Sequence, residues 1–492
     1  MLKVKTIFSH VMAIEPIQRQ SIISFIWKIA LTFIGFLSTM YFAHTVGAGV
    51  LGGYFLFMAY FGIINLVSDG GLAGAAIKRI SEGDEQDAYF SAFFVLRSFF
   101  VTVIIVALLT FRESFADLND AGVFNWMLVA LIASLIYGPL NNAIAGRGKI
   151  GIQATCGFIN EITRIFVQVL TVFLGYGVAG LVGGFVAGMI IASVIELRFF
   201  DLHLVRFKWY HVKSLSTFSF WLFLTSSGVM VYSYADTVMI GYYMSNNDVG
   251  VYRVVMQFTS IAALATTSLQ VTLWPKVSRW SKTGEIKQIE ESLSRAITYA
   301  LLLATPMCIG GILIGDKLLY YFYGTDFAKG YPVLIVLFIV QVINVFQIFF
   351  LAYLGAMDMQ KDAFRATSVA VTANVVLNAV LINMIGITGA GIATFVTLFL
   401  NALLARQVLE KTMTIALERK SLVNILKAAF IMGLFLGVYR IVVTLSNVWI
   451  TLISIVLGAA VYGILVLRFD RKIYEELKGI TIQMSVIWSK SS

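Results

Sequence analysis

The sequence predicts an all-α membrane protein of about fourteen transmembrane helices. Of its 492 residues, 59% are apolar and 13% are charged, against roughly 45–50% and 25% in a soluble globular domain. The apolar residues fall into blocks of about 20, near the length that a helix needs to cross a hydrocarbon core of roughly 30 Å. Short polar turns separate the blocks, so successive helices are expected to follow one another closely.

The longest polar stretch, RFFDLHLVRFKWYHVKS at residues 198–214, divides the apolar blocks into two sets. The first six helices are expected near 21–42, 53–76, 89–111, 124–145, 152–174 and 178–197. Eight more are expected near 217–243, 249–274, 296–320, 331–354, 366–385, 388–408, 424–445 and 447–467. The polar stretch is expected to form a cytoplasmic linker.

Lysine and arginine residues set the expected orientation, because they accumulate in short cytoplasmic loops. With the N-terminus inside, the outer side holds only Arg112, Lys317 and Lys329 of the 36 basic residues, apart from a few within helices. Both termini are therefore expected in the cytoplasm, in a multi-pass protein of the cytoplasmic membrane. The first helix is expected to act as an uncleaved insertion signal, and the tail from Asp470 to lie along the inner interface as an amphipathic helix.

The net charge of +10 does not indicate a nucleic-acid partner, because the basic residues lie mostly at the ends of apolar blocks. The two cysteines, Cys156 and Cys308, lie inside such blocks, and the four histidines lack ligand spacing. No disulfide, metal site or cofactor is expected.

Two pairs of segments indicate an internal repeat. GAGVLGGYFLF at 47–57 resembles SNNDVGVYRVV at 245–255, and GYGVAGLVGG at 175–184 resembles IGITGAGIAT at 385–394. Six spans separate the copies, so both run in the same sense, as in two-lobed transporters built from parallel repeats. The expected divisions are a six-helix lobe with its linker, a second six-helix lobe, and two extra helices with a cytoplasmic tail. They span residues 1–214, 215–422 and 423–492.

Three segments resemble a known family. They are DTVMIGYYMSNNDVGVYRVV from Asp236, YGTDFAKGYPVL from Tyr323, and NVVLNAVLINMIGITGAGIAT with Asn374 and Asn378. The chain is similar, over nearly its whole length, to the Wzx-type polysaccharide flippases of the multidrug, oligosaccharidyl-lipid and polysaccharide exporter superfamily. The resemblance implies two six-helix lobes around a central cavity that opens alternately to either side, with the last two helices beside them.

The resemblance also implies a cargo and partners. The expected cargo is an oligosaccharide on a polyprenyl phosphate or diphosphate, translocated for surface polysaccharide or glycan assembly. The sugar would occupy the cavity while the lipid stays in the bilayer. The implied partners are membrane lipid, glycan-assembly proteins and a coupling proton or sodium ion.

Arg97, Glu161 and Arg164 are the candidate substrate-binding residues. A charged side chain in the hydrocarbon region costs about 2.5–3.5 kcal/mol, so it usually faces a cavity or a partner. The two arginines would attract the diphosphate or acidic sugars, since guanidinium binds phosphate bidentately. Glu161 and Arg164 share one helix face and would pair when the site is empty; a purely structural ion pair is the equally weighted alternative.

Asp69 and Asp236 are the candidates for ion coupling. Asp69 lies in NLVSDGGLAG, where capping of a broken helix is the favoured alternative. Lys28, Arg253 and Arg440 are weaker candidates, because they lie close enough to helix ends for their charges to reach the interface.

One motif is rejected as a nucleotide site. Gly175, Gly177 and Gly180 spell GxGxxG, but dinucleotide binding needs a strand before the motif. A tight turn is expected instead, with close helix packing through Gly180, Gly184 and Gly188.

Two other functions compete with the flippase. An ion-coupled multidrug or metabolite exporter of the same superfamily would share the lobes, but such proteins usually stop at twelve helices. A membrane glycosyltransferase or polymerase would need a loop carrying acid and base groups. The expected loops lack these groups, so the sequence predicts a transporter and no enzyme.

Overall fold

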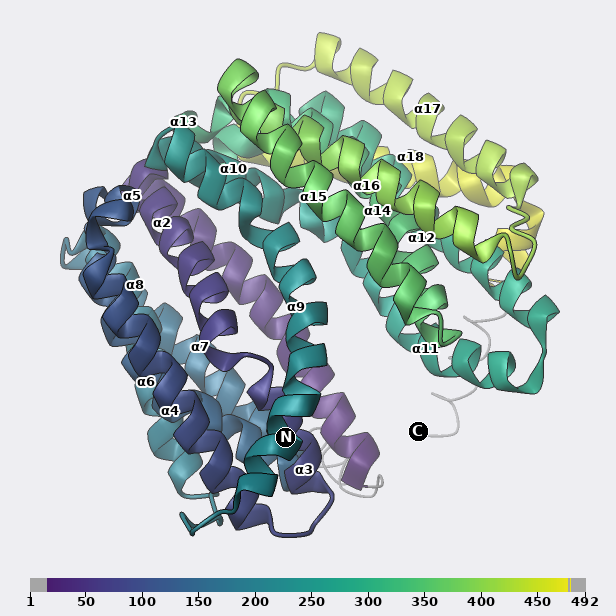
Figure 1. Cartoon of the computed structure of the whole chain (residues 1–492). Coiled ribbons are helices and arrows are strands. Elements are labelled where there is room, and N and C mark those ends of the chain that lie inside the picture. Colours follow the sequence, from purple (N-terminus) through teal and green to yellow (C-terminus); the bar gives the residue numbers. More distant parts are fainter. Residues whose placement is uncertain (1–15, 477, 479–492) are drawn as a thin grey trace, which may run out of the picture. The chain divides into compact units, whose positions relative to one another are not determined.

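A computed structural model describes residues 16–476 and residue 478 of the chain (Figure 1). The chain forms two compact units, residues 1–250 and residues 251–492. Residues 479–492, the greater part of the expected amphipathic tail, lie outside the described residues.

The first unit holds helices α2 to α9 and the first turn of α10. Their bounds are α2 Pro16–Asp69, α3 Leu72–Ser81, α4 Gln86–Thr110, η1 Arg112–Ser114, α5 Ala116–Asp120, α6 Phe124–Gly146, α7 Ile150–Phe173, α8 Gly177–Leu197, α9 Trp209–Tyr243 and α10 Asn246–Thr259.

The second unit continues from α10 and ends with α18. Its elements are η2 Ser260–Ala263, α11 Leu264–Thr283, α12 Ile286–Tyr323, α13 Thr325–Ala328, α14 Tyr331–Ala356, α15 Gln360–Ile385, α16 Ile387–Leu409, α17 Arg419–Val442 and α18 Val448–Phe469.

Within the described residues, twelve helical segments are long and apolar enough to cross a membrane. The protein is thus an all-helical membrane protein, as its composition predicts. One of the twelve segments belongs to α2, in which two helices join across a kink at Gly47, where φ is 75°. The 35-residue helix α9 comes in addition to these twelve.

Two expected helices are interrupted in the structure. The helix expected at 53–76 ends at Asp69, because Gly70 and Gly71 adopt φ values of 55° and 78° that end the helical path before α3 begins. The helix expected at 249–274 is divided by the 3₁₀ turn η2 between α10 and α11. Window hydropathy does not detect either break, because it averages over a turn of this length. The residues Asp69, Gly70 and Gly71 did indicate the first break, which the favoured capping role of Asp69 assumes.

Close contact between α7 and α8 depends on the glycines that the sequence singled out. A Cβ on Gly180 would lie 2.7 Å from the hydroxyl of Thr171, and one on Gly184 would lie 2.9 Å from the carbonyl oxygen of Arg164. A Cβ on Gly188 would lie 2.7 Å from the carbonyl oxygen of Asn160. Small residues let membrane helices approach this closely, so the expected packing of this stripe is confirmed.

The turn before α8 is also as expected. Gly175 and Gly177 have φ values of 84° and 53°, a region that glycine enters without steric cost. The GxGxxG motif therefore has a structural explanation that involves no nucleotide.

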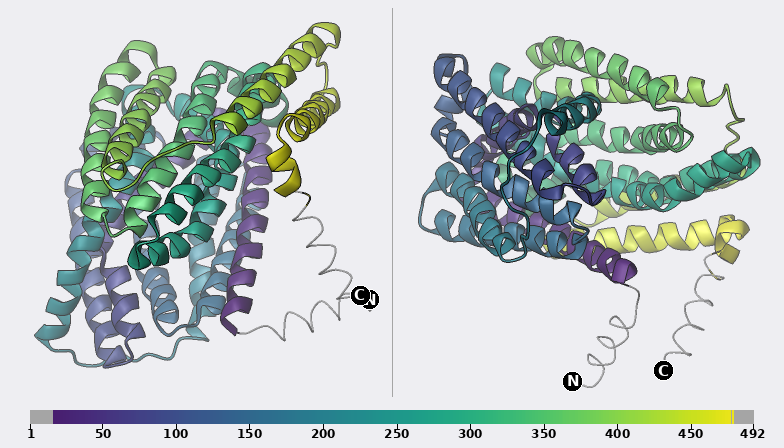
Figure 2. Two further views of the ribbon diagram at one scale, coloured as in Figure 1. Left: turned by 90° about the vertical axis from the view of Figure 1, so that its right-hand side faces the viewer. Right: turned by 60° about the horizontal axis from the view of Figure 1, so that its bottom comes forward.

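In the second unit, the last two helices share a core with α12. Buried residues such as Met432 of α17 and Tyr462 of α18 pack with Ile309 of α12. The Tyr462 hydroxyl donates a hydrogen bond to the carbonyl oxygen of Leu302, at 2.8 Å. Figure 2 shows α17 and α18, in yellow-green and yellow, following one another at the C-terminal end of this unit.

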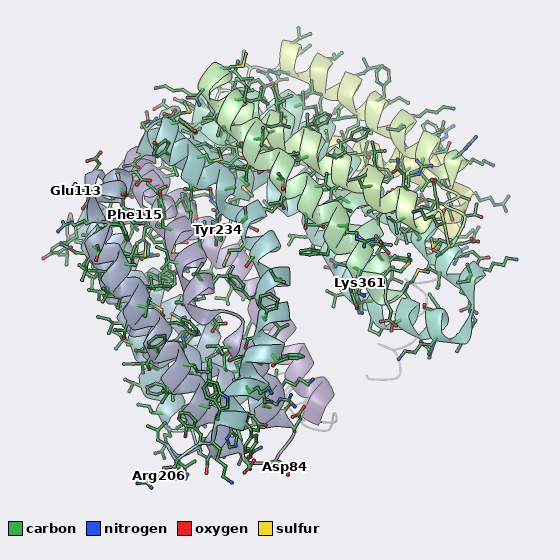
Figure 3. All side chains as sticks on the ribbon, viewed as in Figure 1. Asp84, Glu113, Phe115, Arg206, Tyr234 and Lys361 are labelled. Atoms are coloured by element: carbon green, nitrogen blue, oxygen red, sulfur yellow. The ribbon has the colours of Figure 1, made fainter. Side chains whose placement is uncertain are left out.

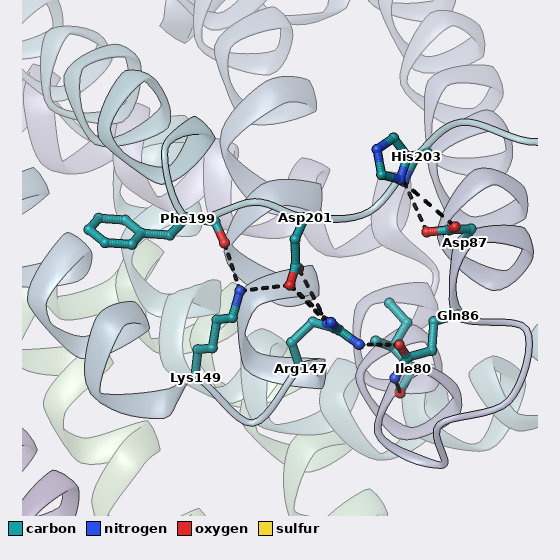
Figure 4. A network of polar contacts seen from close by, with 8 residues as sticks. All are labelled: Ile80, Gln86, Asp87, Arg147, Lys149, Phe199, Asp201 and His203. Carbon is teal, nitrogen blue, oxygen red and sulfur yellow. Dashed lines mark hydrogen bonds and ion pairs between the residues drawn. The ribbon is translucent and has the colours of Figure 1, made fainter.

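A polar network ties the α8–α9 linker to one end of the first unit (Figure 4). Asp201 of the linker accepts hydrogen bonds from Arg147 Nη2 and Lys149 Nζ, each at 2.9 Å. The backbone N–H of His203 donates to Asp87 at the start of α4, at 2.9 Å. Figure 3 places Asp84, in the α3–α4 turn, and Arg206 at this same end, and Glu113 and Phe115 at the other.

Gly52 and Gly250, the matched glycines of the first repeat pair, meet in the structure. A Cβ on Gly52 would lie 1.6 Å from the carbonyl oxygen of Asn246. A Cβ on Gly250 would lie 2.0 Å from the carbonyl oxygen of Ala48. The second helix of α2 and the first turn of α10 thus touch backbone to backbone.

We expect Gly52→Ala to destabilise the protein by about 1–3 kcal/mol, the usual cost of overpacking, because its methyl group would overlap backbone atoms. Gly49→Ala is the matched control, since a Cβ on Gly49 meets nothing within 4 Å. Thermal unfolding in detergent measures both. Equal melting temperatures for the two variants would contradict the close approach.

The Asp201 network should make stability depend on pH. The hydrogen bond from Arg147 is the main cause that lowers the pKa of Asp201 from 3.8 to about 2. A lowered pKa in the folded state gives stabilisation that is present above about pH 4 and is lost as the pH falls toward 2.

We therefore expect Asp201→Asn to lose on the order of 1 kcal/mol at pH 7, after allowance for solvent screening of this partly exposed pair. The difference from the unmodified protein should vanish near pH 2. Asp84→Asn, at an exposed residue of the same end, should change little. Unfolding curves at several pH values provide the measurement, and a pH-independent difference would count against the ion pair.

Candidate functional site

The break between α2 and α3 carries a buried ion pair. Arg97 of α4 donates a short hydrogen bond from Nη1 to Asp69 Oδ1, and the two side chains are 4% and 13% exposed. Arg97 Nη2 donates a second hydrogen bond to Asn65 Oδ1 at 3.0 Å. The guanidinium also lies against Gly138 of α6, where an added Cβ would come within 3.0 Å of Nη2.

Asp69 also caps the helix that follows it. Its Oδ2 accepts a hydrogen bond from the backbone N–H of Ala73, at 3.2 Å. Next to it, Gly71 fits against α9, since an added Cβ would lie 2.4 Å from the carbonyl oxygen of Ser219. The capping role that the sequence favoured for Asp69 is present, together with a pairing to Arg97 that the sequence did not predict.

The second charged pair lies on α7 and is more open. Arg164 Nη2 is paired with Glu161 Oε2, and the side chains are 20% and 33% exposed. Arg164 also interacts with Tyr54 of α2. The pairing expected from their three-residue spacing is therefore present. Of the two arginine candidates, Arg164 has the more exposed side chain, and its carboxylate partner Glu161 is also partly exposed.

A third polar group joins α6, α7 and α8. Glu196 of α8 is fully buried and accepts a hydrogen bond at 2.6 Å from Asn141 of α6. Gln153 of α7 donates to Asn141 at 2.9 Å. Sequence reasoning missed this group because Glu196 stands at the end of an apolar block, where a carboxylate usually marks a solvated helix end.

The other candidates are dispersed. Asp236 is buried in α9, and Arg253 lies in α10, with Nη1 at 3.7 Å from the Met256 sulfur. Arg440 Nη2 lies 2.7 Å from Asp316 Oδ2 of α12. Its charge therefore has a partner within the protein, in addition to any contact with the membrane interface. Lys28 belongs to α2, but its side chain lies outside the described residues.

An apolar groove lies in the second unit, with a volume of about 540 Å³. It runs between α12, α14 and the last two helices, and among the described residues no charged side chain lines it. Its walls include Leu303, Pro306, Met307, Phe338, Ile455 and Tyr462.

No group of three or more His, Cys, Asp or Glu residues within the described part of the chain could hold a metal ion. Cys156 and Cys308 are both buried and are not bonded to one another.

Two sequence comparisons agree on a family. Residues 49–332 match the model of a family described as "Polysaccharide biosynthesis protein". The chain is 28% identical over 452 residues to a Haloferax volcanii protein named "Probable low-salt glycan biosynthesis flippase Agl15". The alignment covers 92% of this chain and 96% of that protein.

Solved structures share the fold. The lipid II flippase MurJ, in an inward closed conformation, matches with a TM-score of 0.79 at 18% identity, covering 92% of this chain and 100% of that one. An inward-facing multidrug resistance MATE family transporter of the MOP superfamily matches with a TM-score of 0.65 at 15% identity, covering 78% and 96%.

The Asp69–Arg97 pair should show strong energetic coupling. Removing one partner of a buried pair costs about 3–5 kcal/mol, because the other charge is left uncompensated. We therefore expect Asp69→Asn and Arg97→Gln each to lower the melting temperature strongly, and the double variant to cost less than the sum.

The exposed pair of Asp362 and Arg365, at 3.4 Å, supplies the matched control. Its double-mutant cycle should give a coupling close to zero, as for most exposed pairs. Additive effects of the Asp69 and Arg97 changes would mean that the buried pair contributes no coupling.

Proposed function

The chain belongs to the polysaccharide biosynthesis protein family of flippases, and from this premise we propose that it translocates an oligosaccharide linked to a polyprenyl phosphate or diphosphate. It is a multi-pass transporter and not an enzyme. The proposed setting is the cytoplasmic membrane, where the lipid-linked sugar is made available for surface polysaccharide or glycan assembly. The name of the Haloferax volcanii relative, a probable glycan biosynthesis flippase, supports a role in glycan assembly.

The proposed topology has fourteen spans. The twelve candidate segments become fourteen when α2 is divided at Gly47 and α9 is added. An even number, together with the distribution of Lys and Arg, supports two cytoplasmic termini. The proposed divisions remain a first repeat at 1–214, a second repeat at 215–422 and a C-terminal part at 423–492. They follow the repetition in the sequence, whereas the two compact units are defined by contacts. Alternating access is the expected transport cycle.

The observation that carries the proposal is the partly exposed Arg164 on the membrane helix α7. Placing a guanidinium there is costly unless water or an anionic group can reach it. Glu161 neutralises it in the absence of cargo through one contact, and a phosphate or diphosphate would replace the carboxylate and bind the guanidinium through two oxygens. Arg97 would bind the same anion only after its ion pair with Asp69 had broken, because that pair is almost fully buried.

The lipid part of the cargo has a matching surface in the apolar groove of the second unit. Its walls carry no charged side chain, so a hydrocarbon chain can replace membrane lipid there without loss of hydrogen bonds. We assign this groove to part of the polyprenyl chain, while the sugar stays in the polar region.

Asp236 remains the proposed site of ion coupling, with a proton or sodium ion as the driver. Asp69 is the second proposed site, and an ion there would replace the contacts that its oxygens make with Arg97 and the N–H of Ala73. Proteins of glycan assembly are the proposed partners.

An ion-coupled exporter of drugs or metabolites remains the second candidate, since the MATE fold is shared. A cationic group at Arg164 favours an anionic cargo over a cationic drug. Export of cationic drugs by the purified protein, without movement of lipid-linked sugar, would favour the exporter.

We expect Arg164→Ala to abolish translocation of lipid-linked oligosaccharide, because the anion loses its bidentate donor, while Arg164→Lys retains part of the activity. The measurement uses purified protein in vesicles that contain a fluorescent lipid-linked sugar, with protection from a membrane-impermeant quencher as the readout. Depletion of the protein in cells should also leave the sugar lipid on the cytoplasmic leaflet.

Arg365→Ala is the control, because it removes the same charge from a side chain that is highly exposed. Expression and melting temperature should match the unmodified protein in each variant. Normal translocation by a well-folded Arg164→Ala protein would refute the site.

A further inference from the structure

A second, chemically different pocket lies in the second unit, where α16 ends and α17 begins. Its volume is about 760 Å³, and it is bounded by α14, α16, the segment joining α16 to α17, and the start of α17. We call it the arginine pocket, because Arg406 of α16 and Arg419 of α17 both line it.

Apart from these two residues, the walls of the arginine pocket are apolar. Phe346 and Phe350 of α14 form one side, and Phe399 of α16 forms another. From Phe399 to Arg406 the helix advances seven residues, or roughly 10 Å at 1.5 Å per residue. The arginine pocket is therefore a hydrocarbon slot with its cationic groups at one end.

The segment between α16 and α17 holds this slot in shape. The backbone N–H of Thr414 donates to Glu290 of α12, at 2.5 Å, and the side chain of Met413 is buried. Lys472 donates to Glu418 at 2.6 Å. Ile415 and Leu417, between these two anchors, contribute to the wall.

The two arginines are not fully compensated by the carboxylates around them. Arg406 Nε pairs with Glu410 Oε1 at 2.8 Å, on a partly exposed helix surface. Glu418, beside Arg419, is already paired with Lys472. Among the described residues, no carboxylate lies within ion-pair distance of Arg419. The N-terminal end of α17 adds positive potential at the same place.

These features select one class of ligand. A purely apolar molecule gives the arginines no partner, and a free anion leaves the aromatic walls in contact with water. Helix ends lie near the membrane interface, where lipid phosphates are found. We propose that the arginine pocket binds an anionic phospholipid, with its phosphate at Arg406 and Arg419 and one acyl chain along Phe346 and Phe399.

The apolar groove assigned to the cargo differs on this point, because no charged residue lines it. The apolar groove thus suits a hydrocarbon chain whose headgroup lies elsewhere. The arginine pocket suits a lipid that is bound by its headgroup as well. The inference does not depend on the proposed function, since lipid binding is measured without any transport.

Native mass spectrometry of the full-length protein from nanodiscs tests the proposal. The probes are nanodiscs of phosphatidylglycerol, which is anionic, and of phosphatidylcholine, which carries no net charge. We expect one phosphatidylglycerol to be retained in preference to phosphatidylcholine. Arg406→Gln with Arg419→Gln should weaken this retention by about fivefold for each arginine, since each basic residue near a membrane surface contributes about that factor.

Lys411→Gln with Arg365→Gln is the matched control, since it removes the same two charges from residues that do not line the arginine pocket. It should retain phosphatidylglycerol normally. A second variant, Leu403→Trp, keeps both arginines but fills the slot beside Phe399, and it should also lose the lipid. Melting temperatures near that of the unmodified protein would show that each variant is folded.

Four results would overturn the proposal. The first is equal retention by the arginine variant and its control. The second is normal binding by Leu403→Trp, and the third is displacement of the lipid by inorganic phosphate alone; either would mean that the headgroup suffices. The fourth is selective retention of a polyprenyl phosphate instead of phosphatidylglycerol, which would make the cargo lipid the occupant.

Discussion

The cost of a charge in hydrocarbon constrains the whole interior of this protein. A carboxylate or guanidinium there needs a partner or access to water, and the described helices supply both. Asp69 and Arg97 satisfy one another in a nearly closed site, whereas Arg164 is paired but accessible. The same rule makes Arg97 a structural element and Arg164 a candidate for anion binding, although both are arginines on expected membrane helices.

The second constraint comes from the backbone. Membrane helices have no hydrophobic driving force toward one another, so close contact depends on small residues and interhelical hydrogen bonds. The glycine stripe of α8 and the meeting of Gly52 with Gly250 follow this rule. Breaks occur where glycine permits positive φ, as at Gly47 and Gly71. At the second break, the freed N–H of Ala73 is satisfied by Asp69, so the ion pair and the break stabilise one another.

The two pockets of the second unit differ in which part of an amphipathic ligand they suit. A groove without charged residues fits hydrocarbon, while the arginine pocket combines aromatic walls with cations at a helix end. The proposed cargo and the surrounding membrane lipids share phosphate groups and long chains, so a flippase for such a cargo has to distinguish between them. Placing the two chemistries at separate positions on the last helices would let structural lipid bind without competing with cargo.

Hydropathy and charge by themselves determined that the chain is a multi-pass helical membrane protein, because apolar length is a property of local sequence. Spacing also predicted the Glu161–Arg164 pair and the packing of α8, which depend on one helical repeat. Only the tertiary structure decided that Arg97 pairs with Asp69, that Arg440 pairs with Asp316, and that Glu196 is buried. Those contacts join different helices, and helix periodicity does not specify which faces of distant segments meet.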